Sequence, residues 1–251
     1  MRIIFALVVL AFAYIKYTIS TTKETNPYAG EVQRVALTPE QEVQMGLQAV
    51  NQMAAQHGGL HPDQVAQDFV DKVGAKLVAH TNSILEPGAK PIGYPFEFHV
   101  LRDEEAVNAF ALPGGLVFIT AALLKKFQSE DQLAGVLGHE VGHVLAKHSN
   151  QQMAKGGLFA GVGQAVAVLV GGDGGMGGHT NGSMANKVLS SKFARDDETE
   201  SDTIGAELMK QAGYDARQLI EVMKILQESS GGGGGPDFLS THPFRRAGSI
   251  T

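Results

Sequence analysis

Apolar residues recur along this 251-residue chain with two periods, one typical of amphipathic helices and one typical of strands. The helical period predicts helices at residues 38–56, 62–80, 129–147 and 186–211. Shorter apolar runs between proline- and glycine-rich turns predict strands at residues 96–101, 106–111 and 116–120. Helices, a small antiparallel sheet and then two more helices indicate a mainly helical α+β fold.

Composition narrows this picture to one domain over residues 23–251, because the chain is 43% apolar and long enough to bury one substantial core. We expect the small antiparallel sheet beside the helix at 129–147. A net charge of −6 argues against a nucleic-acid partner. The absence of cysteine excludes disulfides and a lipid-modified cysteine, so any metal must be held by nitrogen and oxygen ligands.

Residues 1–22 form a separate segment, with a short basic start followed by an apolar run at 3–15. That length suits the core of a signal peptide better than a spanning helix, which needs about 20 residues. The cleavage site is poor, since Ala11-Phe12-Ala13 lies too close to the start. An uncleaved membrane anchor therefore stays open, and a buried N-terminal helix is the third reading.

The strongest chemical signal is His139-Glu140-Val141-Gly142-His143, inside the predicted helix at 129–147. The two histidines lie about 40° apart on one helical face, so both rings can reach one metal ion. Glu140 is placed to hold and deprotonate a zinc-bound water, as in HExxH hydrolases. The alternative is a pair of hydrogen-bonded core histidines.

Three glycines and a further histidine accompany the motif. Gly135, Gly138 and Gly142 are poor helix formers. They indicate close approach of another backbone or of substrate, or tight helix packing without functional meaning. His148 lies about 140° round the helix from His143, so we expect it to face away, in a surface or helix-end role.

A catalytic zinc usually has three protein ligands, and the acidic run at 195–202 is the source of candidates for the third. On a helix at 186–211, Glu198 and Asp202 share a face, which lets Glu198 bind metal while Asp202 supports a histidine. The other acids of this run are expected to be solvated residues of a helix start: Asp196, Asp197 and Glu200.

Four blocks occur in a specific order and spacing: HEVGHVLAKHS from His139, ExExD at 198–202, AGYD at 212–215 and STHP at 240–243. Together they resemble the zinc metallopeptidase family of the HtpX heat-shock protease, the CAAX prenyl endopeptidase and periplasmic BepA-like proteases. The resemblance implies one zinc ion per chain with three ligands: His139, His143 and Glu198.

The resemblance also implies roles for three other residues. Glu140 takes the role of general base. Asp202 falls where the family has a supporting carboxylate, sometimes assigned as proton donor; we favour the orientation of a ligand histidine. In relatives, a histidine of the His-Pro segment occupies the open zinc position and keeps the enzyme latent, a metal-binding role that His242 can take here. An exposed loop histidine is the alternative.

Two segments leave questions open. The family commonly has an arginine six residues after the His-Pro histidine, but this position is Gly248 here. Arg245 or Arg246 can substitute for it, so the transition-state stabiliser is left unassigned. Residues 158–170 predict a helix packed over the active site or used as a lid, or equally a plain scaffold helix. The glycine tract at 171–178 predicts a mobile connection, with His179 exposed to solvent.

The sequence thus predicts a zinc-dependent endopeptidase of the bacterial cell envelope, exported to the periplasm and associated with the membrane if residues 1–22 are retained. Its substrates would be unfolded or misfolded polypeptides, held by pairing with a strand edge near the zinc. The alternative is a chaperone-like binding module in which His242 closes the zinc site. The presence of Glu140 favours hydrolysis. A non-catalytic protein would be expected to lose this residue first, because it contributes nothing to metal coordination.

Overall fold

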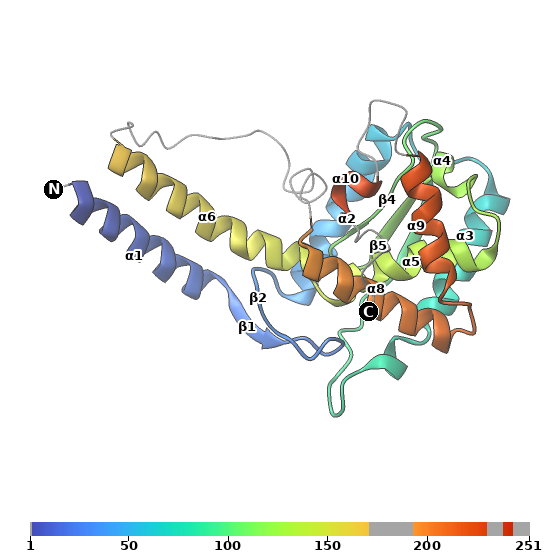
Figure 1. The fold of residues 1–251 in the computed structure, drawn as a ribbon, viewed down its shortest axis with the longest axis horizontal. Helices are drawn as coiled ribbons and strands as arrows, with labels where there is room; N and C mark the ends of the chain where they lie inside the picture. Colours follow the sequence, from blue (N-terminus) through green and yellow to red (C-terminus); the bar gives the residue numbers. More distant parts are fainter. Residues whose placement is uncertain (1, 171–192, 230–237, 243–251) are drawn as a thin grey trace.

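The computed structural model of the protein describes residues 2–170, 193–229 and 238–242 (Figure 1). Its helices are α1 (Arg2–Ser20), α2 (Pro39–Gln56), α3 (Gln64–Val78), α4 (Ala121–Leu124), α5 (Glu130–Leu145), α6 (His148–Val170), α8 (Arg195–Gln211), α9 (Gln218–Ser229) and α10 (Phe238–Thr241), with a 3₁₀ turn at Thr81–Ile84. Its strands are β1 (Thr22–Thr25), β2 (Val32–Val35), β3 (Glu97–Leu101), β4 (Ala109–Leu112) and β5 (Leu116–Thr120). Helices predominate over two small sheets, which confirms the predicted α+β class.

The larger sheet has the strand order β3, β5, β4 and is mixed. β4 and β5 are antiparallel because the short turn at 113–115 joins them directly. β3 pairs with β5 in parallel, since the connection at 102–108 carries the chain to the far edge before β5 returns to the centre. The expected antiparallel pairing is therefore confirmed for β4 with β5, and it is wrong for β3 with β5.

Capping signals decide where the early helices begin. The Thr38 hydroxyl accepts a hydrogen bond from the backbone N–H of Gln41, whose side chain in turn accepts from the backbone N–H of Thr38. The Asp63 carboxylate accepts from the backbone N–H of Val65 at the start of α3. The helices predicted at 38–56 and 62–80 are confirmed, with ends that differ by at most two residues.

α5 lies at the centre of the protein, and every residue from Gln132 to Leu145 is buried. The neighbouring helices α3, α8 and α9 and the edge strand β4 surround it (Figure 1). Ser129 caps its start by accepting a hydrogen bond from the backbone N–H of Gln132. The HExxH sequence therefore sits on a rigid element whose side chains have little freedom to move.

α5 and α8 approach each other at backbone distance, which explains the glycines of the motif. A Cβ atom at Gly142 would lie 2.6 Å from the backbone oxygen of Ser201, and one at Gly205 would lie 2.8 Å from the carbonyl carbon of Gly138. The Ser201 hydroxyl uses this proximity to donate a hydrogen bond to the backbone carbonyl of His139. Close approach of a second backbone, one of the two predicted reasons for these glycines, is confirmed.

α1 and α6 lie side by side and extend together away from the rest of the protein (Figure 1). α1 buries Ala6 and Ala13, while most of its large apolar side chains are exposed. The reading of α1 as a buried helix is therefore wrong. α6 begins just after α5 and runs away from it, so the expectation that residues 158–170 cover the active site is wrong as well. The tract at 171–178 and His179 lie outside the described residues.

The contact between α5 and α8 can be tested with a pair of glycine substitutions. Gly142→Ala should destabilise the protein by about 1–3 kcal/mol, because its methyl group meets rigid backbone. Gly156→Ala in α6, where a Cβ has no neighbour within 4 Å, should be neutral or stabilising by up to about 1 kcal/mol. Thermal unfolding of both variants checks this; equal stability of the two would contradict the packing described here.

Candidate metal centre

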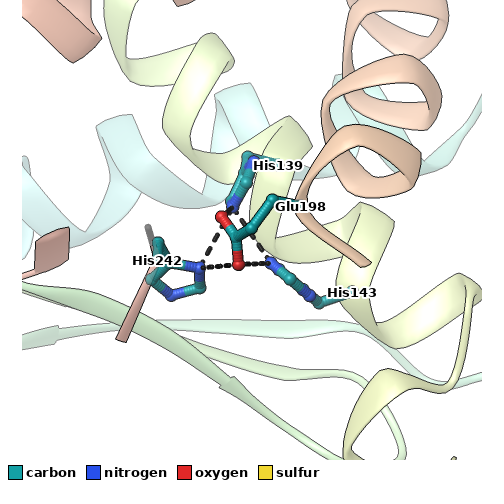
Figure 2. A group of neighbouring side chains, drawn as sticks. All are labelled: His139, His143, Glu198 and His242. Carbon is teal, nitrogen blue, oxygen red and sulfur yellow. Dashed lines mark hydrogen bonds and ion pairs between the residues drawn. The ribbon is translucent and has the colours of Figure 1, made fainter. Parts of the chain in front are cut away.

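Four side chains from three parts of the chain converge on one buried point (Figure 2). α5 contributes His139 and His143, which lie one turn apart on the same face. α8 contributes Glu198 from its first turn, and His242 follows directly after α10. The ligand atoms of all four lie within 4.8 Å of one another.

The spacing between these atoms is that of ligands around a single ion. His139 Nε2 lies 3.0 Å from His143 Nε2 and 3.2 Å from His242 Nδ1. Glu198 Oε1 lies 3.1 Å from His242 Nδ1 and 3.6 Å from His143 Nε2. Ligands held tetrahedrally about 2.0–2.1 Å from a zinc ion stand about 3.3 Å apart, so these four contacts have the lengths expected between ligands of one such ion.

Within the part of the chain that the structure describes, two buried carboxylate oxygens at the cluster lack hydrogen-bond partners, which indicates a site for a cation. Among the described residues, Glu198 Oε2 and Glu140 Oε1 are buried without a hydrogen-bond partner. An unsatisfied buried carboxylate oxygen is costly unless a positive charge compensates it. Imidazole nitrogen and carboxylate oxygen are ligands that zinc accepts readily. The residues present therefore fit a divalent metal ion of the zinc type.

Burial and facing charges displace the pKa values of the cluster in opposite directions. Burial raises the pKa of Glu198 to about 7 and raises that of Glu140 as well. Burial lowers the pKa of His242 to about 3. Burial also acts to lower the pKa of His139, but the facing carboxylates, Asp202 foremost, outweigh it and raise that pKa to about 9. A bound cation would stabilise the ionised carboxylates and displace the proton that His139 otherwise holds.

Glu140 lies at the border between this cluster and the sheet. Its carboxylate accepts a hydrogen bond from the backbone of Ala111 in β4. Its Oε1 atom lies 3.6 Å from His242 Nε2. The predicted position of Glu140 beside the histidines, with one oxygen free to take a proton, agrees with this geometry.

Asp202 lies where the helical spacing places it, one turn after Glu198 on α8. Its Oδ1 atom is 2.8 Å from His139 Nδ1, the ring nitrogen that points away from the cluster. A carboxylate on that nitrogen keeps the proton there and leaves Nε2 free for a metal. The arrangement agrees with the orienting role favoured from the sequence.

A comparison with known families supports the chemistry of this site. The sequence profile of peptidase family M48 matches residues 71–247, a span that contains all four clustered residues. The chain belongs to peptidase family M48.

Relatives of this M48 chain come from bacteria and from mitochondria. The β-barrel assembly-enhancing protease of Escherichia coli K12 is 28% identical over 88% of the chain and 45% of its own length. The mitochondrial metalloendopeptidase OMA1 of Saccharomyces cerevisiae is 33% identical over 64% of the chain and 46% of its own length. OMA1 of Arabidopsis thaliana is 37% identical over 56% of the chain and 28% of its own length. The chain thus spans less than half the length of these relatives.

In this M48 chain, the expectations for His148 and Glu200 are corrected. His148 is the first residue of α6, which agrees with the predicted helix-end position, but it is fully buried, with its Nδ1 atom 2.7 Å from His143 Nδ1, instead of facing away at the surface. Its Nε2 atom lies 2.9 Å from Glu200 Oε2, so Glu200 is not simply a solvated helix-start residue. The cause is Lys147, whose positive φ of 59° ends the helical path and turns His148 back toward the motif.

The start of α8 is also later than predicted. Residues 193 and 194 are not helical, so the helix expected from 186 begins at Arg195, and residues 186–192 lie outside the described chain. The Asp197 side chain accepts a hydrogen bond from the backbone N–H of Ala194. Glu198 therefore stands in the first helical turn, where the helix dipole stabilises a carboxylate.

Two phenylalanines that the sequence did not single out line the centre. Phe238 stacks on His242, with ring centroids 4.4 Å apart. Phe193 stacks on His143 at 4.1 Å. His242 is only 2% exposed, so the alternative of an exposed loop histidine is wrong. Arg245, Arg246 and Gly248 lie outside the described residues.

Metal binding at this centre can be tested by removing one carboxylate charge. Glu198→Gln should weaken metal binding by more than the roughly 10–100-fold that the loss of a supporting contact costs. Asp196→Asn is the matched control, because Asp196 is exposed on the same helical turn. Metal content after dialysis against a graded chelator series measures both. Full retention of metal by Glu198→Gln would rule out Glu198 as a ligand.

Proposed function

We propose that the protein is a zinc-dependent endopeptidase in which His139, His143 and Glu198 hold one zinc ion. The observation that carries this proposal is the set of ligand atoms within 4.8 Å of one another in a chain of a peptidase family. Zinc, when bound, polarises a substrate carbonyl and makes a water molecule more acidic. Glu140 takes the proton of that water and passes it to the departing amine. Asp202 keeps the ring of His139 in the orientation for binding.

Substrate selection follows from the position of β4. This strand forms one edge of its sheet, and its Ala111 backbone reaches the Glu140 carboxylate. An extended polypeptide that pairs with the free edge of β4 would lie beside the proposed base. Such pairing uses backbone groups, so it favours unfolded or misfolded chains over a particular sequence. We infer that these, in the bacterial cell envelope, are the substrates.

His242 gives the site a closed, latent form. Its Nδ1 atom stands 3.2 Å from His139 Nε2 and 3.1 Å from Glu198 Oε1, at the corner that a substrate oxygen would need. The backbone of Phe238 is tied to the carbonyl of Val107, just ahead of β4. Withdrawal of His242 would therefore open the metal and free the space beside β4 in one movement.

The same contact favours a second candidate function. If His242 never leaves, the protein is a zinc-stabilised, chaperone-like module that holds polypeptides on β4 without cutting them. The buried Glu140 carboxylate argues for hydrolysis, because a charge that costs free energy to bury has no role in such a module.

The two functions differ in the cleavage of an unfolded protein such as casein. We expect the full-length chain, loaded with zinc, to cleave casein, and His242→Ala to cleave it faster. Glu140→Gln should retain zinc and lose about 10²–10⁴-fold in rate, the usual contribution of a general base. Absence of cleavage by both the wild-type protein and His242→Ala, with zinc bound, would establish the binding module instead.

We further propose that α1 is a retained membrane anchor of an exported protein. Its 19 residues are long and apolar enough to cross a membrane, since about 1.5 Å per residue nearly matches a bilayer core of about 30 Å. Ala6 and Ala13 form a seam of small residues that is covered within the structure, next to α6. This packing supports retention over cleavage, because removal of α1 would leave α6 without the element against which it packs most extensively.

Retention of α1 predicts where the protein is found in cell fractions. The full chain should sediment with membranes and stay there at high pH, while a chain starting after residue 20 should be released. Mass spectrometry of the mature N-terminus is the control. A soluble protein that begins near residue 22 would show that α1 is a cleaved signal peptide.

A further inference from the structure

His148 and Glu200 lie on the side of His143 that faces away from the ligand cluster, and the family resemblance assigns them no role. Its Nε2 atom faces the ligand cluster, 3.0 Å from His139 Nε2. Its other ring nitrogen, Nδ1, lies 2.7 Å from His148 Nδ1. His148 Nε2 in turn lies 2.9 Å from Glu200 Oε2. A continuous row of contacts thus leads from a carboxylate on α8 through His148 to the back of a proposed zinc ligand.

The proton positions along this row follow from the chemistry of its ends. An ionised carboxylate only accepts hydrogen bonds, so His148 must donate from Nε2 to Glu200. A neutral His148 then carries no proton on Nδ1, which accepts from His143 Nδ1–H. His143 is left with an unprotonated Nε2, the form that binds a metal. Of the neutral arrangements, only this one gives both contacts of the row a donor and an acceptor, and it leaves His143 Nε2 for the metal.

The backbone bears a strain that this arrangement explains. Lys147 is the one non-glycine residue with positive φ in the described chain, at 59°, a conformation that costs a side-chain-bearing residue free energy. Its ammonium pairs with Glu24 at 2.7 Å and is almost fully buried. Asn150 fixes the following turn by accepting hydrogen bonds from the backbone N–H groups of Ala36 and Leu37. Without this kink, His148 would continue round the helix and point away from His143.

We propose that His148 and Glu200 are positioning residues for zinc binding by His143, as Asp202 is for His139. The two histidine ligands would then be oriented by separate carboxylates of α8. Asp202 acts directly on His139 Nδ1 at 2.8 Å, whereas Glu200 acts through an interposed imidazole. The proposal rests on the proposed function, because it needs zinc at this centre.

The alternative is that His148 is a core histidine that only fills space, and two substitutions separate the readings. His148→Leu removes the acceptor for His143 and fills most of the volume. His148→Asn keeps an acceptor oxygen close to the position of Nδ1. We expect zinc affinity, measured on the full chain by competition with a chromophoric chelator, to fall about 10–100-fold in His148→Leu. His148→Asn should recover most of that loss. This recovery is expected even if metal-free His148→Asn melts at a lower temperature than metal-free His148→Leu.

Glu200 supplies the second test, through a double-mutant cycle. Glu200→Gln should weaken zinc binding in the wild-type background and have no further effect in His148→Leu, because the two act in series. Glu207→Gln is the matched control: it removes the same charge from a half-exposed position later on α8, remote from His148 in the sequence. The control should leave zinc affinity unchanged.

The results of these experiments either establish or overturn the positioning role of His148 and Glu200. Unchanged zinc affinity in His148→Leu, no recovery in His148→Asn, or additive effects of the His148 and Glu200 substitutions would overturn the positioning role while leaving the zinc peptidase intact. Failure of the wild-type chain itself to bind zinc would overturn both. Recovery by asparagine together with a non-additive cycle would establish the role, since loss of packing alone predicts neither.

Discussion

The close packing of α5 against α8 is the constraint on which the centre depends. Gly142 lies against Ser201 with no room for a side chain, and the Ser201 hydroxyl binds the His139 carbonyl. At this separation, both Glu198, one turn before Ser201, and Asp202, directly after it, face the motif histidines. Glu198 and Asp202 therefore reach His139 from opposite sides of its ring. The short distance between the α5 and α8 backbones therefore decides which carboxylates can reach the histidines.

This close packing also buries ionisable side chains, and their charges must be compensated inside the protein. α5 is buried from Gln132 onward, so its motif brings a glutamate and two imidazoles into the interior. Burial raises the pKa of Glu198 to about 7, which means that ionisation of this group is costly in the protein alone. A bound divalent cation would reverse that balance and couple metal binding to stability. His242 completes the enclosure by filling the remaining corner from a third part of the chain.

The helical pattern could be predicted from the sequence because it follows from regular periodicity. The same periodicity placed the candidate residues of α5 and α8 on common faces, whereas His242 was suggested only by the family resemblance. His139 and His143, and then Glu198 and Asp202, are each four residues apart on a helix. Prediction from the sequence failed wherever the chain departs from a regular path. The turn of Lys147 into positive φ cannot be predicted from a lysine, since that conformation is typical of glycine, and the burial of His148 against His143 was missed with it. The parallel pairing of β3 depends on the route of a loop, and the direction of α6 depends on its contact with α1, neither of which has a local signal.

The proposed divalent ion between α5 and α8 can be tested most directly by X-ray diffraction at the zinc absorption edge. Crystals of the zinc-loaded protein should give a single strong anomalous peak about 2.0–2.2 Å from the facing nitrogens of His139 and His143 and from the Glu198 carboxylate. An anomalous peak that lies elsewhere, or a fully loaded protein without one at this point, would contradict the proposal.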